Sequence, residues 1–182
     1  PISSVYENNF ILSLGRLVET KGLKYLVDAM QNVECKLIIC GKGPEEKNLK
    51  KQIRKLRLED KIEMKGYVSE EEKSQLMSTC KFFVMPSLFE SLGLAAIELM
   101  SYGRPIVCTD VNGLPDTVGN AGVVVPAKDS VALSNAINEL LMNEEKRISM
   151  RSIARSQAET YDWKFYIERF ESLLNTIASV EK

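Results

Sequence analysis

Short apolar runs alternate with segments of helical periodicity along almost the whole chain. The runs are nearly continuously apolar, which is typical of strands buried on both faces of a parallel sheet. They lie at Phe10–Leu14, Lys36–Cys40, Ile62–Lys65, Phe82–Met85, Ile106–Cys108 and Val123–Val125. Between them, apolar residues recur at helical spacing, as in Leu23, Leu26, Val27 and Met30. This rhythm predicts an α/β fold, a Rossmann-like doubly wound parallel sheet of about six strands.

The chain ends in a stretch that shows only helical periodicity, from about residue 143 onward. An apolar stripe on its last helix consists of Tyr166, Phe170, Leu173, Leu174 and Ile177. We expect this stretch to be a helical extension that lies over the sheet. The 182 residues are enough for one full hydrophobic core. Residues 10–182 are therefore predicted to form one domain, and residues 1–9 a polar lead-in.

The composition excludes several classes of site. A formal net charge of −1 argues against a general nucleic-acid binder, which needs an excess of Lys and Arg. The chain has no histidine, which excludes His-based triads and His-rich zinc sites. Its four cysteines form no C-x-x-C pair, and three lie in or beside apolar runs. We expect them to be small buried apolar residues in a reducing compartment.

The sequence shows no segment that would carry the chain into a membrane. Its longest apolar runs are strand-sized, far short of the roughly 20 residues that a membrane span needs. No basic region followed by an apolar run stands at the N-terminus, so no secretory signal is visible. We expect a cytoplasmic location, with any membrane contact only peripheral and at the inner face.

Two cations follow the first predicted strand. Arg16 and Lys21 lie beside Gly15 and Gly22, which allow a tight backbone turn. Ligands of open parallel sheets bind beyond the carboxyl ends of the strands, because loops and helix N-termini meet there. Two cations near a helix N-terminus would suit a diphosphate. The alternative is a pair of solvated surface charges.

Two carboxylates follow the fourth predicted strand. Glu98 lies in segment 94–100, which is otherwise apolar all round, so we expect a buried helix. A buried carboxylate must be paired or hydrogen-bonded, and either a sugar diol or a structural Arg or Lys would satisfy it. Glu90 lies in the loop before this helix, at the ligand edge. Gly93 and Leu94 mark the helix start, where free backbone N–H groups can meet a phosphate.

Other features of the same edge are weaker. Gly41-Lys42-Gly43 lacks the third glycine of a dinucleotide fingerprint and follows the second strand, which disfavours an NAD-dependent oxidoreductase. A tight turn explains these residues equally well. Tyr67 either stacks on a nucleobase or is an ordinary loop tyrosine. A phospho-receiver domain would need an aspartate at the end of the third strand, where Met64-Lys65-Gly66 stands.

In this order, the motifs resemble those of the C-terminal domain of the large retaining GT-B glycosyltransferase family, or glycosyltransferase group 1, which includes many mannosyl- and glucosyltransferases. Gly15-Arg16-Leu17 followed by Lys21-Gly22 resembles its diphosphate-binding turn. Glu90 and Glu98, with seven residues between them, resemble its E-x7-E signature. Asn112–Asp116 resembles its Gly-Leu-Pro-Glu loop, with Asp116 in place of Glu, and Tyr161-Asp162-Trp163 resembles the start of its last helix. The likeness runs from about Phe10 to Leu174.

The resemblance implies a donor site for a UDP-, GDP- or ADP-sugar, whose hexose passes to a glycan, lipid or small-molecule acceptor in carbohydrate or polysaccharide biosynthesis. Arg16 and Lys21 would hold the diphosphate and, with Glu90, form the catalytic set. Glu90 would bind the transferred sugar and Glu98 the ribose. The remaining donor-binding residues implied are Tyr67 and Val68 at the base, and the backbone amides of Leu92, Gly93, Leu94 and Ala95 at the sugar and phosphates.

The resemblance also implies a mechanism and a missing partner. Members of this family retain the anomeric configuration, usually by a front-face substitution assisted by the leaving group, without a cofactor or a metal at this site. The absence of an Asp-x-Asp pair agrees with this. They carry an N-terminal acceptor-binding domain that nothing in these residues supplies, so we expect the isolated chain to be inactive. A non-catalytic nucleotide-sugar-binding module and half of a nucleotide-sugar epimerase remain alternatives.

Overall fold

Six parallel strands form the centre of the molecule. The computed structural model describes residues 7–180, except the side chains of residues 165, 166, 168, 169 and 178–180. The strands are β1 (Phe10–Leu14), β2 (Lys36–Cys40), β3 (Ile62–Gly66), β4 (Phe83–Met85), β5 (Ile106–Thr109) and β6 (Gly122–Val125), in the order β3-β2-β1-β4-β5-β6. The prediction of a Rossmann-like doubly wound sheet is confirmed.

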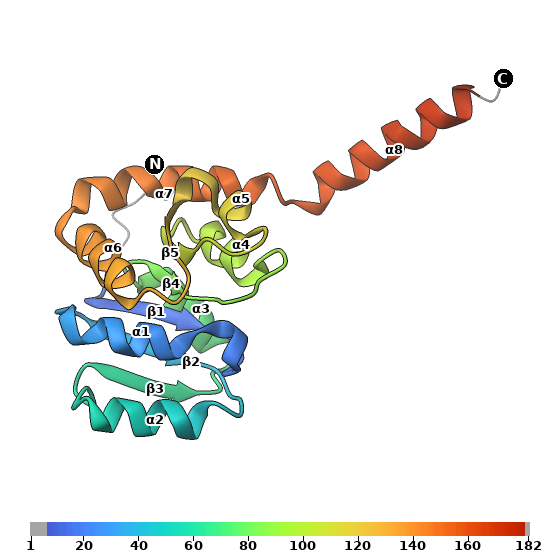
Figure 1. Ribbon diagram of the computed structural model, residues 1–182. Coiled ribbons are helices and arrows are strands. Elements are labelled where there is room, and N and C mark those ends of the chain that lie inside the picture. The colour runs from blue at the N-terminus through green and yellow to red at the C-terminus, as the bar shows by residue number, and fades with distance from the viewer. Residues whose placement is uncertain (1–6, 181–182) are drawn as a thin grey trace.

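Helices cover both faces of this sheet (Figure 1). One face carries α1 (Leu23–Ala29), α2 (Glu46–Lys55) and α6 (Ser130–Met142). The other carries α3 (Glu70–Thr79), α4 (Leu94–Ser101), α5 (Leu114–Val118) and α7 (Glu144–Glu159). The short 3-10 turns are η1 (Glu19–Lys21), η2 (Met30–Asn32) and η3 (Gly119–Ala121).

Alternate residues of each central strand enter opposite cores. In β2, Leu37 and Ile39 pack with α1 and α6, whereas Ile38 and Cys40 pack with α3 and α4. All four are at least 95% buried. Full burial of one such aliphatic side chain stabilises the fold by about 1.5–3 kcal/mol. Burial on both faces therefore explains why the strands appear in the sequence as continuous apolar runs.

The four cysteines lie inside these cores. Cys35, Cys40, Cys80 and Cys108 are all buried, as expected, and all four are free thiols. Burial raises the pKa of the Cys40 thiol to about 11 and that of Cys108 to about 12. Both thiols therefore stay protonated at neutral pH and act as small apolar side chains.

The C-terminal stretch departs from the prediction. Helix α7 packs against α4, but α8 (Trp163–Val180) projects away from the sandwich (Figure 1). The stripe residues Phe170, Leu173, Leu174 and Ile177 are 49–62% exposed, and the side chain of Tyr166 lies outside the described residues. The prediction that the whole extension covers the sheet is therefore wrong for α8. Within residues 7–180, no helix is both long and apolar enough to cross a membrane.

Gly22 joins the turn after β1 to the loop after β4. It has a φ of 62°, caps the N-terminus of α1 and follows directly on Lys21. A Cβ atom at this position would lie 2.0 Å from the carbonyl oxygen of Pro86. Only glycine allows the two loops to approach this closely, so Gly22 fixes where Lys21 lies relative to β4.

We predict that Gly22→Ala destabilises the protein more than Gly66→Ala does. Gly66 has a similar φ of 72°, but nothing lies within 4 Å of its would-be Cβ atom. Gly66→Ala should therefore lower the free energy of unfolding only by the cost of holding alanine in a left-handed backbone conformation, about 1–2 kcal/mol. Gly22→Ala adds a steric clash, worth about 1–3 kcal/mol more. Urea unfolding of both variants measures the difference, and equal losses would contradict the close approach.

Candidate functional site

The strand order creates a crevice at the carboxyl edge of the sheet. β1 pairs with β2 on one side and with β4 on the other, so the helices that follow β1 and β4 lie on opposite faces. In open α/β sheets, the loops part at this switch point and leave room for a ligand. The turn after β1 and the loop after β4 border this crevice.

Arg16 and Lys21 both line a narrow cleft at this point, together with Gly15, Pro86 and Ser87. Arg16 is exposed, and its backbone carbonyl accepts from the N–H of Val18 at 3.0 Å, but its guanidinium forms no hydrogen bond or ion pair with another described residue. The neighbouring Leu17 is 1% exposed, and its N–H donates to the carbonyl of Lys42 at 3.0 Å. This anchored neighbour fixes the backbone of Arg16 and leaves its guanidinium available to an anion.

Lys21 forms an ion pair with Glu90. The Nζ atom of Lys21 donates to Oε2 of Glu90, and their side chains are only 27% and 14% exposed. The structure therefore brings two of the three predicted catalytic residues into direct contact. In this arrangement, the carboxylate of Glu90 balances the positive charge of Lys21.

The start of α4 lies in the same region. Gly93 caps this helix with a φ of 72°, and the N–H groups of Leu94 and Ala95 belong to its first turn, where intrahelical acceptors are lacking. Leu92 and Leu94 are 42% and 72% exposed. Two of the four predicted amide donors, Leu92 and Leu94, are therefore exposed at the positive end of a helix dipole, whereas Ala95 is half-buried and Gly93 is buried.

The loop around Asp116 supports this segment. Thr117 on α5 donates its hydroxyl to the carbonyl of Leu92 at 2.8 Å. A Cβ atom on Gly113 would lie 2.6 Å from the carbonyl oxygen of Ser91, so the two loops are in close contact. Asp116 itself is exposed. The segment that resembles a Gly-Leu-Pro-Glu loop therefore braces the residues between Glu90 and α4.

A wider hollow of about 350 Å³ adjoins the cleft. Arg16 lines both spaces, and Tyr67 and Val68 line the hollow. Tyr67 is 73% exposed, and the Nζ atom of Lys42 lies 5.9 Å from the centre of its ring. The hollow thus offers an accessible aromatic face beside the cationic cleft, which suits a planar heterocycle.

The expected burial of Glu98 is wrong. Its side chain is 44% exposed, and Oε1 accepts from Nζ of Lys73 on α3 at 2.9 Å. On α4, Ala96, Leu99 and Met100 face the core, whereas Leu94 and Glu98, four residues apart, share the exposed side. The structural lysine partner that the sequence left open is therefore present.

Lys73 and Ser87 are residues at this site that sequence reasoning missed. Lys73 lines the hollow and also pairs with Glu70 at 2.6 Å, and its hydrogen bonds to Glu70 and then Glu98 raise its pKa. Ser87 is fully buried in the wall of the cleft, and its Oγ has no hydrogen-bond partner among the described residues. No pattern in the sequence distinguishes Lys73, which lies among solvated charges. Ser87 is only one of several residues that follow β4.

No metal-binding group is visible among the described side chains. No cluster there gathers three or more Cys, Asp or Glu side chains that could hold an ion. In the cleft, the positive charge available to an anion comes from Arg16 and Lys21. The arrangement therefore offers cationic side chains and helix amides to a ligand that carries both a planar ring and negatively charged oxygens.

Comparison with known proteins identifies the family. The family model described as Glycosyl transferases group 1 matches residues 3–157. The chain is 32% identical over 147 residues to alpha-D-kanosaminyltransferase from Streptomyces kanamyceticus, covering 77% of this chain and 38% of that protein. It is 32% identical over 178 residues to phosphatidyl-myo-inositol mannosyltransferase from Mycobacterium leprae, covering 93% and 47%.

A solved structure has the same fold. Anabaena Alr3699/HepE, in complex with UDP and glucose, superposes with a TM-score of 0.83 at 26% identity, covering 94% of this chain and 49% of that one. The chain spans less than half the length of both curated relatives described above. On the strength of the family match and these relatives, the chain belongs to the group 1 glycosyl transferases.

Proposed function

We propose that this chain is the donor-binding half of a retaining glycosyltransferase, which moves a hexose from a nucleotide-diphosphate sugar to an acceptor. The order of the features along the crevice carries this proposal. The aromatic hollow comes first, Arg16 lines both the hollow and the cleft, and the cleft leads to Lys21 and its partner Glu90. A nucleotide sugar has the same order: base, ribose, diphosphate and sugar.

The base and ribose would occupy the hollow. Tyr67 and Val68 would border the base, with the exposed ring of Tyr67 as a stacking surface. Glu98 remains suited to the ribose although it is ion-paired, because only its Oε1 accepts from Lys73. Its second oxygen can accept from a ribose hydroxyl, since a carboxylate has about four acceptor sites.

The diphosphate would lie between Arg16 and Lys21. When the glycosidic bond breaks, the departing nucleoside diphosphate gains negative charge, and fixed cations stabilise the transition state more than the ground state. The N–H groups of Leu94 and Ala95 would add the positive end of α4. Because these groups supply the positive charge, we propose that the site works without a metal ion.

The transferred sugar would lie next to Glu90. A donor that enters the cleft brings its own negative oxygens to Lys21, so the Lys21–Glu90 pair can part and release the carboxylate to accept from sugar hydroxyls. The leaving group and the acceptor would occupy the same face of the sugar. A substitution on that face retains the anomeric configuration, which is the outcome that we propose.

The acceptor would bind to a second domain of a longer protein. The chain covers only 38–47% of the length of the two curated relatives described above. The exposed stripe of α8 supports the same view, because four large apolar side chains on one helix normally lie against a partner surface. We propose a glycan, lipid or small molecule as the acceptor, and a cytoplasmic location at most peripherally attached to a membrane.

Nucleotide binding tests the donor site. We predict that UDP, GDP or ADP raises the midpoint of thermal unfolding, and that EDTA does not change this shift. Arg16→Ala should weaken binding roughly tenfold to a hundredfold, because one charge-assisted contact contributes about 1.5–3 kcal/mol. Arg54→Ala, on the exposed side of α2, is the matched control and should bind as the wild type does. Equal affinities of the Arg16 and Arg54 variants would remove Arg16 from the site.

Catalysis should require the proposed acceptor-binding domain as well as this chain. We predict that the isolated chain binds nucleotide weakly and transfers no sugar from radiolabelled UDP- or GDP-hexoses to acceptor mixtures. The physical reason is that half the surface that orients the acceptor and excludes water is missing. Sugar transfer by the isolated chain above the level of a Lys21→Ala, Glu90→Ala double variant would refute this.

A further inference from the structure

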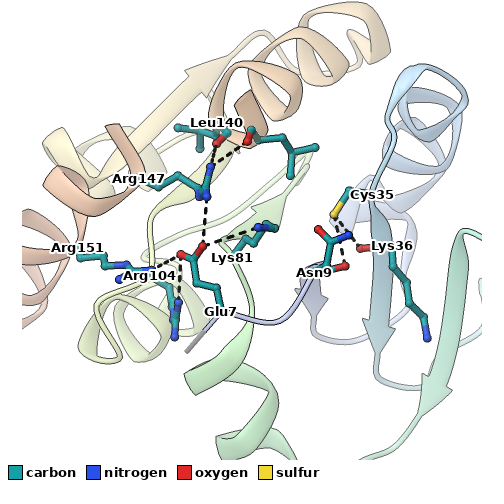
Figure 2. A network of polar contacts seen from close by, with 10 residues as sticks. Glu7, Asn9, Cys35, Lys36, Lys81, Arg104, Leu140, Arg147 and Arg151 are labelled. Atoms are coloured by element: carbon teal, nitrogen blue, oxygen red, sulfur yellow. Dashed lines mark hydrogen bonds and ion pairs between the residues drawn. The ribbon is translucent and has the colours of Figure 1, made fainter. Parts of the chain in front are cut away.

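A cluster of charged side chains lies at the amino edge of the sheet, opposite the donor crevice. It consists of Glu7, Lys81, Arg104, Arg147 and Arg151, called here the amino-edge cluster (Figure 2). Glu7 precedes β1, Lys81 precedes β4 and Arg104 precedes β5, whereas Arg147 and Arg151 come from α7. The two sites are therefore at opposite ends of the same strands.

One carboxylate, that of Glu7, forms ion pairs with all four cationic side chains of this cluster. Oε2 of Glu7 lies 3.2 Å from Nη2 of Arg147 and 3.9 Å from Nζ of Lys81. Oε1 lies 3.6 Å from Nη1 of Arg104 and accepts a hydrogen bond from Arg151. Among the described residues, Glu7 is the only carboxylate within 4.0 Å of any of these cations. Figure 2 shows the cationic side chains converging on it.

Helix ends neutralise part of this charge. Arg104 donates to the carbonyl of Ser78 in the last turn of α3. Arg147 donates to the carbonyls of Leu140 and Leu141 in the last turn of α6, at 2.6 and 3.0 Å. The C-terminus of a helix carries about half a negative charge, so two helix ends and one carboxylate still leave an excess of positive charge.

Because the arginines are buried, this excess of positive charge carries a desolvation cost. Arg104 is fully buried and Arg147 is 3% exposed. The Nε and Nη1 atoms of Arg104 and the Nε atoms of Arg147 and Arg151 have no hydrogen-bond partner among the described residues. Buried charges are normally paired and fully hydrogen-bonded, because an unsatisfied one loses its hydration without compensation. Burial, followed by repulsion from Arg151, lowers the pKa of Arg104.

A ligand can supply the missing negative charge. Residues 1–6 contain no acidic side chain. Guanidinium groups bind phosphate oxygens with two parallel hydrogen bonds, and a phosphate monoester carries up to two negative charges where Glu7 supplies one. Lys81 and Arg151 are 18% and 13% exposed, so the cluster has an opening to solvent at these two residues.

We propose that the amino-edge cluster is a binding site for a phosphate group, which takes the place of the Glu7 carboxylate among the three arginines and Lys81. Without a bound phosphate, the carboxylate of Glu7 occupies the site. The site does not depend on the proposed transferase function, because none of its residues lines the donor crevice. Inorganic phosphate, a soluble phosphate ester and a lipid phosphate headgroup share the chemistry that it recognises.

Calorimetric titration with inorganic phosphate at constant ionic strength tests the site. Wild type should bind saturably, and Glu7→Gln should bind at least tenfold more tightly because the competing carboxylate is gone. Arg151→Gln should bind at least tenfold more weakly. Arg155→Gln, an exposed arginine on the same helix, is the matched control and should not change the affinity. Arg16→Ala should also leave it unchanged, which separates this site from the donor site.

Two results would overturn the proposal. One is the absence of saturable phosphate binding in both wild type and Glu7→Gln; the other is binding that Arg16→Ala abolishes and Arg151→Gln does not affect. If circular dichroism shows that Arg151→Gln is unfolded, Lys81→Gln replaces it with the same expectation.

Sedimentation with phosphatidylcholine vesicles, with and without phosphatidic acid, identifies the source of the phosphate group. If vesicle binding requires phosphatidic acid and is lost in Arg151→Gln, the phosphate group is that of a lipid headgroup. If the protein binds inorganic phosphate saturably but does not bind vesicles, the ligand is a soluble phosphate.

Discussion

The pairing of β1 with β4 is the constraint on which the rest of the site depends. These strands are far apart in the sequence, and their adjacency places the turn after β1 against the loop after β4. Gly22 lets the two segments touch, and the Lys21–Glu90 ion pair spans them. Neither side chain could do its proposed work alone, because a cation for the diphosphate and a carboxylate for the sugar must lie a few ångströms apart.

Features with a local physical cause could be predicted from the sequence. The strands follow from burial on both faces, and the positions of Arg16 and Lys21 follow from the rule that loops after parallel strands converge. The contact between Lys21 and Glu90 could not be predicted at the level of atoms, because it depends on the closeness of two loops. Ser87 and Lys73 could be assigned to the site only from the structure, because it shows that Ser87 lines the cleft and Lys73 lines the hollow.

Two errors share one cause, which is that a pattern within one helix does not specify its neighbours. Segment 94–100 is apolar except for Glu98, yet α4 is covered on one side only and turns Leu94 and Glu98 to solvent. The stripe on α8 correctly indicates a helix, but its apolar side chains are exposed, because α7 already covers this part of the sandwich. Amphipathic spacing predicts that a face will be buried and does not say against what.

The central claim is that a nucleoside diphosphate lies at the carboxyl edge, with its phosphates between Arg16 and Lys21 and its base at Tyr67 and Val68. A crystal structure of the chain grown with a nucleoside diphosphate tests this most directly. The account predicts phosphate oxygens within hydrogen-bond distance of both cations, with the Lys21–Glu90 pair opened or shared. A nucleotide bound elsewhere, with that ion pair intact and the cleft empty, would contradict it.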